Sequence, residues 1–201
     1  MWRHGQTRWN VERRFQGSTD IPLDDVGISQ AARAARLLAA LQPSNIVSSP
    51  LKRAAATAEA LADVTGLEVA YDDRLVERFG GQWEGLTNYE IWDRFPEHAV
   101  VWQPPDGETE EAVAERVVAA LDDALEATPA GTTLVVVSHG GSLRCGIARF
   151  LGLPDDIWWR LGPLGNCSWS LLGQARGDAR GWRLLEHNAG TLPEPVLSDD
   201  R

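Results

Sequence analysis

The sequence predicts an α/β fold in which a mostly parallel, mixed sheet lies between two layers of helices. Short β-branched or apolar runs alternate along the chain with longer segments of helical periodicity. One run, residues 133–137 (TLVVV), is apolar on both faces, which is typical of a central strand in a covered sheet. Two late segments, residues 167–172 and 182–187, stand on either side of a Gly-rich turn and predict an antiparallel pair.

The first third of the chain predicts two helices around one strand. Apolar residues recur at helical spacing over residues 28–41, and Asp24 or Asp25 can cap the start of this helix. A β-branched strand follows at residues 45–48. The Ala-rich segment 51–64 then predicts a second helix that ends near a glycine.

The middle of the chain predicts a second strand, an excursion and two further helices. Residues 67–71 suit a short strand, whereas residues 79–109 are rich in Gly and Pro and predict an excursion over the core, with a short helix near 88–95. Helical spacing returns over residues 110–127, and the segment 143–151 predicts a helix after the apolar strand.

The length of the chain favours one domain. A chain of 201 residues is within the usual size of a single domain. We therefore expect residues 1–201 to form one domain, with residues 79–109 as a cap-like part of it. Only the tail from Thr191 has a composition that predicts a loose segment.

Composition and charge exclude several classes of function. The formal net charge is −10, which disfavours nucleic acids and anionic membranes as partners because both are bound by basic surfaces. No apolar run approaches the ~18 residues of a membrane span, and the N-terminus has no secretory signal. With only two cysteines, Cys145 and Cys167, we expect a cytoplasmic protein with reduced thiols.

Reactive side chains stand where strands are expected to end. Two serines after the strand at 45–48 precede Arg53, and His139 follows the apolar strand and precedes two glycines. Ligands of open α/β sheets bind outside the carboxyl ends of strands, where helix N-termini favour anions. Arg53 and His139 are therefore expected to share an anion pocket, which Arg3 and His4 join if they also follow a central strand.

Six stretches in a fixed order carry a more specific pattern than any of these residues alone. They are Arg3-His4-Gly5-Gln6-Thr7 with Asn10 and Gln16-Gly17; Leu23 with Gly27, Gln30 and Ala31; Ser48-Ser49-Pro50-Leu51 with Arg53-Ala54 and Thr57-Ala58; Leu75 with Glu77, Gly81 and Trp83-Glu84-Gly85; Gly107-Glu108-Thr109 with Arg116; and Ser138-His139-Gly140-Gly141. Together they resemble the histidine phosphatase superfamily (phosphoglycerate mutase-like, branch 1) over about residues 3–190.

The resemblance implies a three-layer, phosphoglycerate mutase-like fold and a phosphatase that needs no metal or other cofactor. His4 would attack phosphorus through a ring nitrogen and form a phosphohistidine, which divides one difficult displacement into two easier ones. Arg3, Arg53, His139 and Asn10 would surround the phosphoryl oxygens and stabilise the charge of the transition state.

The resemblance also assigns the acid and the remaining contacts. Glu77 would protonate the leaving alcohol and then activate the water that releases phosphate. Gln16 and Gly140 would contact the substrate, a small phosphorylated metabolite.

Two departures from the family pattern affect the expected site. In the family an apolar strand leads into the Arg-His-Gly motif, whereas only Met1 and Trp2 precede it here. Without that strand His4 would lie at a fraying terminus. We therefore expect the native chain to start upstream of Met1, which intact-mass measurement on the native protein tests.

The second departure concerns the reaction. Mutases of the family carry extra basic residues after the catalytic glutamate, whereas Arg78 and Arg94 are the only Lys or Arg between Glu77 and Glu108. This favours hydrolysis. The C-terminal segment from residue 161 to residue 188 is similar to the C-terminal part of glucosyl-3-phosphoglycerate phosphatases. This similarity suggests glucosyl-3-phosphoglycerate, or a related sugar or glycerate phosphate, as the substrate.

Three other interpretations remain. A phosphoglycerate mutase would need a phosphorylated His4 that is protected from water and a bisphosphate primer. A metal hydrolase could use His4, His139 and Glu77 as zinc ligands. A catalytically impaired phosphoester-binding protein would result from a distorted pocket. Separately, the apolar face of the cap could form the interface of a homodimer.

Overall fold

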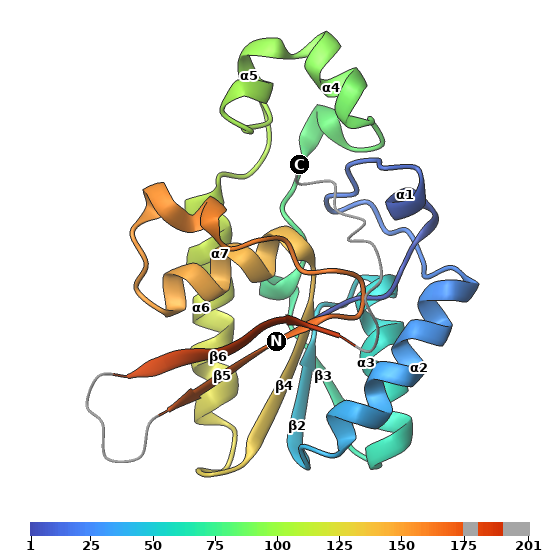
Figure 1. Cartoon of the computed structure of the whole chain (residues 1–201), viewed down its shortest axis with the longest axis vertical. Helices are drawn as coiled ribbons and strands as arrows, with labels where there is room; N and C mark the ends of the chain where they lie inside the picture. Colours follow the sequence, from blue (N-terminus) through green and yellow to red (C-terminus); the bar gives the residue numbers. More distant parts are fainter. Residues whose placement is uncertain (175–180, 191–201) are drawn as a thin grey trace.

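The computed structural model describes residues 1–174 and 181–190, and its framework is a six-stranded sheet in the order β3-β2-β4-β1-β5-β6 (Figure 1). β1, β2, β3 and β4 pair in parallel, and β5 and β6 are antiparallel. The predicted mostly parallel, mixed sheet is confirmed. The strands are β1 (Trp2–Arg3), β2 (Pro43–Ser48), β3 (Val69–Tyr71), β4 (Thr133–Ser138), β5 (Trp169–Gln174) and β6 (Trp182–Ala189).

Helices cover both faces of this sheet. Figure 1 shows α2 and α3 on one side and α6 and α7 on the other, so the three-layer prediction is also confirmed. The α-helices are α1 (Arg8–Val11), α2 (Asp25–Ala39), α3 (Lys52–Thr65), α4 (Asn88–Arg94), α5 (Pro96–Val100), α6 (Glu110–Glu126) and α7 (Gly140–Phe150); the 3₁₀ helices are η1 (Asp73–Leu75), η2 (Gly81–Trp83) and η3 (Asp155–Arg160).

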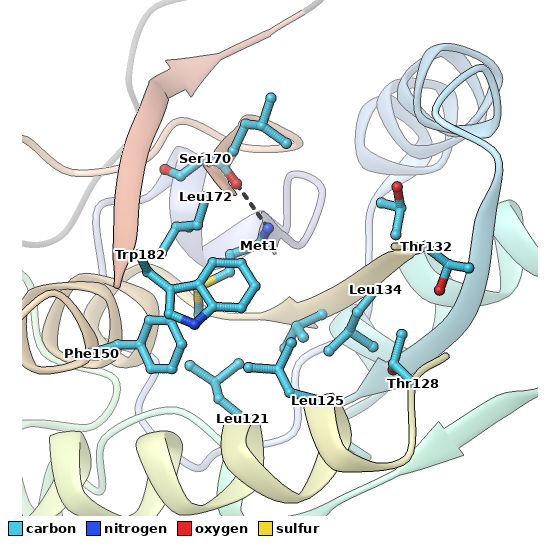
Figure 2. Close-up of a pocket in the computed structure, with 13 residues that line it drawn as sticks. Met1, Leu121, Leu125, Thr128, Thr132, Leu134, Phe150, Ser170, Leu172 and Trp182 are labelled. Carbon is cyan, nitrogen blue, oxygen red and sulfur yellow. Dashed lines mark hydrogen bonds between the residues drawn. The ribbon is translucent and has the colours of Figure 1, made fainter. Parts of the chain in front are cut away.

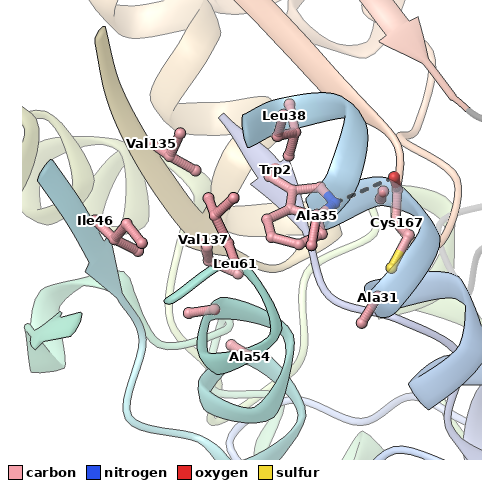
Figure 3. Packing of buried hydrophobic residues seen from close by; sticks show 12 residues of the cluster. Trp2, Ala31, Ala35, Leu38, Ile46, Ala54, Leu61, Val135, Val137 and Cys167 are labelled. Carbon is pink, nitrogen blue, oxygen red and sulfur yellow. Dashed lines mark hydrogen bonds between the residues drawn. The ribbon is translucent and has the colours of Figure 1, made fainter. Parts of the chain in front are cut away.

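Two apolar layers hold the helices to the sheet. On one face Trp2 packs with Leu38 and Leu61 from α2 and α3, and its indole Nε1 donates to the Cys167 carbonyl at 3.1 Å (Figure 3). On the other face side chains of α6 and α7, such as Val117 and Cys145, pack against β4. Burying both faces explains why the strand at 133–137 has no polar side.

The ends of the helices follow local signals, with one exception. Of the two candidate caps of α2, Asp24 accepts the Gly27 N–H at 2.8 Å. α3 ends at Gly66, whose φ of 74° suits a residue without Cβ. The prediction that α7 starts at Leu143 is wrong, because the helix begins at Gly140, directly after the extended His139.

Residues 79–109 leave the sheet and carry α4 and α5 at one end of the molecule (Figure 1). Trp83 is fully buried at the base of this excursion, against Phe15 and Trp102. The short predicted helix is α4. The sequence did not predict α5, although Pro96 is its first residue, a position that proline favours.

β1 is short but joined to both neighbours. Trp2 pairs with β4 and β5, the His4 N–H donates to the Ser138 carbonyl at 3.0 Å, and the Cys167 N–H donates to the His4 carbonyl at 3.1 Å. His4 is only 2% exposed. The expectation that His4 lies at a fraying terminus is therefore wrong, since two strand residues suffice to hold it.

A cavity of ≈ 160 Å³ lies beside Met1, between β4 and β5 (Figure 2). Its walls are mainly apolar and include Leu121, Phe150 and Trp182. The Met1 amino group donates to the Ser170 carbonyl at 2.9 Å, and burial lowers the pKa of this amino group to about 5. None of the predicted site residues lines this cavity.

Two glycines let the loop after His4 approach α2. A Cβ on Gly27 would lie 2.1 Å from the Gln6 carbonyl oxygen, and one on Gly5 would lie 2.5 Å from the Gly27 carbonyl oxygen. We expect Gly27→Ala to lower the free energy of unfolding by about 1–3 kcal/mol, because the two backbones must separate. Urea titration measures this. Gly162→Ala is the control, because a Cβ there meets no atom within 4 Å; equal stability of the two variants contradicts the prediction.

Two parts of the sequence prediction lie outside the described residues. These are the tail from Thr191 and most of the turn between β5 and β6, at 175–180. Among residues 1–174 and 181–190, no helix has the length and apolar character needed to cross a bilayer.

Candidate active site

The predicted site residues converge at the carboxyl ends of β1, β2 and β4. Arg3 is the last residue of β1 and His4 follows it, whereas His139 follows β4. The rings of His4 and His139 lie 5.2 Å apart, and Arg53 Nε donates to His139 Nδ1 at 3.1 Å. All four side chains are buried. The structure thus brings together the four residues that were expected to share an anion pocket.

The hydrogen bond of His4 defines which ring nitrogen is free. His4 Nδ1 lies 2.7 Å from the Gly5 carbonyl oxygen. Because a carbonyl oxygen can only accept, Nδ1 carries the proton and donates it. Nε2 of the neutral ring therefore keeps its lone pair, which is the state that a nitrogen nucleophile requires.

His139 has the opposite tautomer. Its Nδ1 accepts from Arg53, so the proton is on Nε2, which lies 2.8 Å from Ser49 Oγ. His139 can therefore offer one N–H donor while remaining neutral. Arg53 fixes this tautomer, as the partner of one ring nitrogen generally does.

Burial and positive charge keep both imidazoles neutral. Desolvation, followed by the charges of Arg53 and Arg3, holds the pKa of His4 well below the usual histidine value. Desolvation and then Arg53 lower the pKa of His139 in the same way. The two guanidinium groups therefore supply positive charge at this pocket although the whole chain has a net charge of −10.

This electrostatic arrangement predicts a loss of stability on acidification. In the unfolded chain both histidines titrate near ~6.5, so the unfolded state binds more protons than the native state below that pH. The stability that the two neutral histidines contribute is fully present above pH ~6.5. As the pH drops from there toward the pKa values of the folded state, the free energy of unfolding falls by up to about 1.4 kcal/mol per pH unit for each histidine.

Urea titrations from about pH 8 to pH 5 measure this slope. The Met1 amino group contributes with the same sign, since its pKa is lowered to about 5. The slope of the wild-type protein is therefore compared with that of His139→Gln, which is expected to lack the part of the slope that one histidine contributes. An unchanged slope in that variant contradicts the assignment.

The side-chain amide of Asn10 has a buried N–H donor that has no hydrogen-bond acceptor in the described part of the chain. Its Oδ1 accepts from the Thr7 N–H and from Asn166 Nδ2, whereas its Nδ2 finds no hydrogen-bond acceptor within the described residues and is buried. Such a group usually has a partner, and a phosphoryl oxygen suits it. Gln16 lies next to it, where its Oε1 accepts from Thr7 Oγ1 at 2.9 Å.

Glu77 lies at the N-terminus of α7, and the two neighbouring glycines make room. The Gly141 N–H donates to Oε2 at 3.0 Å and the Ser142 N–H to Oε1 at 2.9 Å. A Cβ on Gly141 would lie 2.9 Å from Glu77 Oε1, and one on Gly140 would lie 3.4 Å from the Arg3 guanidinium. The N-terminus expected to bind an external anion therefore binds the protein's own carboxylate.

Three residues that contact the site were not predicted from the sequence. Asn166 bonds Asn10 and the His4 carbonyl, the Leu164 carbonyl accepts from Arg3 Nη1, and Ser142 Oγ lies 3.0 Å from Glu77. Asn166 and Leu164 belong to the tail segment that resembles one subgroup of phosphatases. This resemblance was the only available signal, because neither residue has a local pattern.

The zinc interpretation needs three ligands that converge. Within residues 1–174 and 181–190 no group of three or more His, Cys, Asp or Glu side chains is arranged to hold a metal ion. The nitrogens of His139 face Arg53 and Ser49. A small pocket opens beside Glu77 instead, lined by Phe15, Arg78 and Arg144 among others.

Both phosphatases and a probable mutase are among the sequence relatives and solved structures that this chain is similar to. A glucosyl-3-phosphoglycerate phosphatase of Mycolicibacterium vanbaalenii is 40% identical over 191 residues, 89% of this chain and 85% of that protein. A probable phosphoglycerate mutase GpmB of Salmonella arizonae is 39% identical over 189 residues, 90% of this chain and 87% of that protein. A solved mycobacterial glucosyl-3-phosphoglycerate phosphatase in complex with VO3 has a TM-score of 0.88 at 39% identity and covers 94% of this chain and 98% of its own.

The match to a family model covers almost the whole described chain. The model of the histidine phosphatase superfamily (branch 1) matches residues 1–190, a range that contains every residue of the pocket described above. The chain belongs to the histidine phosphatase superfamily, branch 1.

Proposed function

We propose that the protein hydrolyses phosphomonoesters through a phosphohistidine on Nε2 of His4. The observation that carries this proposal is the hydrogen bond from His4 Nδ1 to the Gly5 carbonyl, in a pocket where burial and two guanidinium groups keep the imidazole neutral. A neutral ring with a free Nε2 can attack phosphorus without first losing a proton.

The first step transfers the phosphoryl group to the enzyme. His4 Nε2 forms a bond to phosphorus while the ester P–O bond breaks, and the leaving alkoxide takes a proton from Glu77. Arg3, Arg53 and the Asn10 amide stabilise the charge that spreads over the phosphoryl oxygens. His139 would contribute its Nε2–H by exchanging its present partner, Ser49 Oγ, for a phosphoryl oxygen.

In the second step water replaces the imidazole. Glu77 accepts a proton from the water, the oxygen bonds to phosphorus, and the P–N bond breaks to release phosphate and free His4. The N–H groups of Gly141 and Ser142 support the carboxylate form of Glu77 that this step uses.

We propose glucosyl-3-phosphoglycerate, or a related sugar or glycerate phosphate, as the substrate. The names of the phosphatase relatives support this choice. Hydrolysis is favoured over mutase activity because Arg78 already donates to the Trp102 and Glu108 carbonyls and to Gln103, and Arg94 lies beside Glu90. Neither arginine is disposed to hold the carboxylate of phosphoglycerate.

Release of inorganic phosphate tests this function. The intact protein is incubated in EDTA with p-nitrophenyl phosphate, 3-phosphoglycerate and glucosyl-3-phosphoglycerate. Release from the third substrate at the highest kcat/KM is the expected result. Isomerisation of 3-phosphoglycerate that depends on a bisphosphate primer would establish the mutase instead. Tight binding of phosphate esters without release would establish a binding protein, and activity only with added zinc a metal hydrolase.

We further propose that the chain acts as one catalytic domain in the cytoplasm, on a small phosphorylated metabolite, without nucleic acid or membrane partners. The net charge of −10 and the burial of both cysteines support this setting. A homodimer through the cap is a further proposal, which the exposed Tyr89 and Val100 support.

A further inference from the structure

We infer that Glu84 is a positioning residue for phosphate binding, acting on Arg53 through the peptide group that joins Gly17 and Ser18. The inference rests on the proposed function in one respect, namely that Arg53 binds the phosphoryl group. Glu84 accepts hydrogen bonds from residues 18, 19 and 80, and Arg53 donates to the carbonyls of residues 17 and 19, so the proposed effect passes through the backbone of residues 17–19.

Two carbonyl groups of this loop orient the guanidinium of Arg53. Arg53 Nη2 donates to the Gly17 carbonyl at 2.7 Å, and Nη1 donates to the Thr19 carbonyl at 2.8 Å. Nε donates to His139. Three donors in fixed directions determine the plane of the guanidinium, and hence where its remaining N–H groups point.

The carboxylate of Glu84 holds the same loop from the other side. Oε1 accepts from the Ser18 N–H at 2.8 Å and lies 3.0 Å from Ser18 Oγ, while Oε2 accepts from the Thr19 N–H at 3.0 Å and from the Thr19 hydroxyl. Oε1 also accepts from the Gly80 N–H at 3.1 Å. Five donors thus surround one carboxylate.

One peptide group makes contact with both charged residues. The Gly17 carbonyl and the Ser18 N–H belong to the same amide, which has Arg53 at its oxygen and Glu84 at its nitrogen. A cation at the oxygen and an anion at the N–H polarise an amide in the same direction, so each strengthens the other's hydrogen bond. Glu84 therefore serves as a counter-charge to the buried Arg53, whose isolated burial would be costly.

Local backbone geometry is adapted to this arrangement. Gly17 has a φ of 54°, and a Cβ at this position would lie 2.1 Å from Glu84 Oε1. Only glycine allows the carboxylate to approach the amide so closely. The glutamate at position 84 and the glycine after Gln16 are thereby explained by one contact.

Glu84→Gln tests the inference because it keeps the shape of the side chain and removes its charge. We expect the Kd of inorganic phosphate to rise about 10-fold and kcat/KM to fall by a similar factor, as for other groups that orient a ligand-binding side chain. Glu90→Gln is the matched control: it makes the same change in the same excursion, where Glu90 caps α4 through Thr87 and pairs with Arg14 and Arg94 at its surface. It is expected to leave both quantities unchanged.

A double-mutant cycle separates positioning from a general structural effect. In an Arg53→Lys background, Glu84→Gln is expected to change the phosphate Kd less than 2-fold, since its effect passes through the guanidinium. An undiminished 10-fold effect in that background overturns the inference, as does wild-type affinity of folded Glu84→Gln. If Glu84→Gln does not fold, Glu84→Asp, which retracts the charge by one methylene, is carried through the same cycle with the same two outcomes.

A hydroxyl variant tests the path. Ser18→Ala combined with Thr19→Ala keeps the two backbone N–H donors and the charge of Glu84, and is expected to retain the phosphate Kd within about 2-fold. A 10-fold loss of phosphate affinity would place the effect in the hydroxyl contacts and overturn the inference that it passes through the peptide group. The binding measurements do not need turnover. A wild-type protein that binds phosphate but releases none from esters refutes the proposed function and leaves the Glu84 test intact.

Discussion

Replacing His4 by alanine is expected to lower kcat for p-nitrophenyl phosphate by about 10⁴-fold or more, because removal of a covalent nucleophile leaves only binding and electrostatic assistance to the direct attack of water. Steady-state release of p-nitrophenol measures the loss. Intact-mass analysis after rapid quenching should show one added phosphoryl group on the wild-type protein and none on the variant.

His98→Ala is the control for this experiment. His98 lies in α5, where its Nδ1 faces the Gln103 carbonyl, and it is outside the proposed pocket. Its kcat is expected to match that of the wild type. Substantial turnover by folded His4→Ala, or a phosphoryl group on another residue, would remove His4 from the mechanism.

The second large effect concerns the proton that leaves with the product. With an alkyl phosphate, Glu77→Gln is expected to lower kcat about 10³-fold, since the amide cannot protonate the leaving oxygen. p-Nitrophenolate leaves without that proton. The variant should therefore release a burst of p-nitrophenol at a rate close to that of the wild type and then turn over slowly, because water attack still lacks a base.

Stopped-flow absorbance resolves the burst, and Glu90→Gln serves again as a control with the same chemical change. Equal losses for the alkyl and nitrophenyl esters in the burst phase would contradict the acid role of Glu77. A fall of thermal stability that alone explains the lost activity would also contradict it.

The fold was largely predictable because its helices and strands have strong local signals. Asp24 caps α2, Gly66 ends α3, and the apolar run in β4 can only be a buried strand. The start of α7 was mistaken because Gly140 and Gly141 have poor helix propensity. At Gly141 the cause is tertiary and no local pattern contains it, because a Cβ there would lie 2.9 Å from Glu77 Oε1.

The site was predictable only in part for a related physical reason. The residues that touch the expected phosphate stand in motifs, so His4, Arg53 and His139 could be named in advance. The partners that orient them are backbone carbonyls, such as those of Gly5 and Gly17, whose direction depends on loops that fold against each other. The same applies to β1, where two residues gain their stability from strands far away in the sequence.

The anchoring of Arg78 has a consequence for how this scaffold can diversify. Arg78 follows Glu77 directly. Its guanidinium donates hydrogen bonds to the segment where the excursion returns to the core, namely to the Trp102 and Glu108 carbonyls and to Gln103. Glu77, the proposed acid, is therefore fixed at the base of the excursion, whereas these contacts do not involve α4 and α5 in its outer part. We expect insertions or replacements between Thr87 and Val101 to leave the position of Glu77 unchanged.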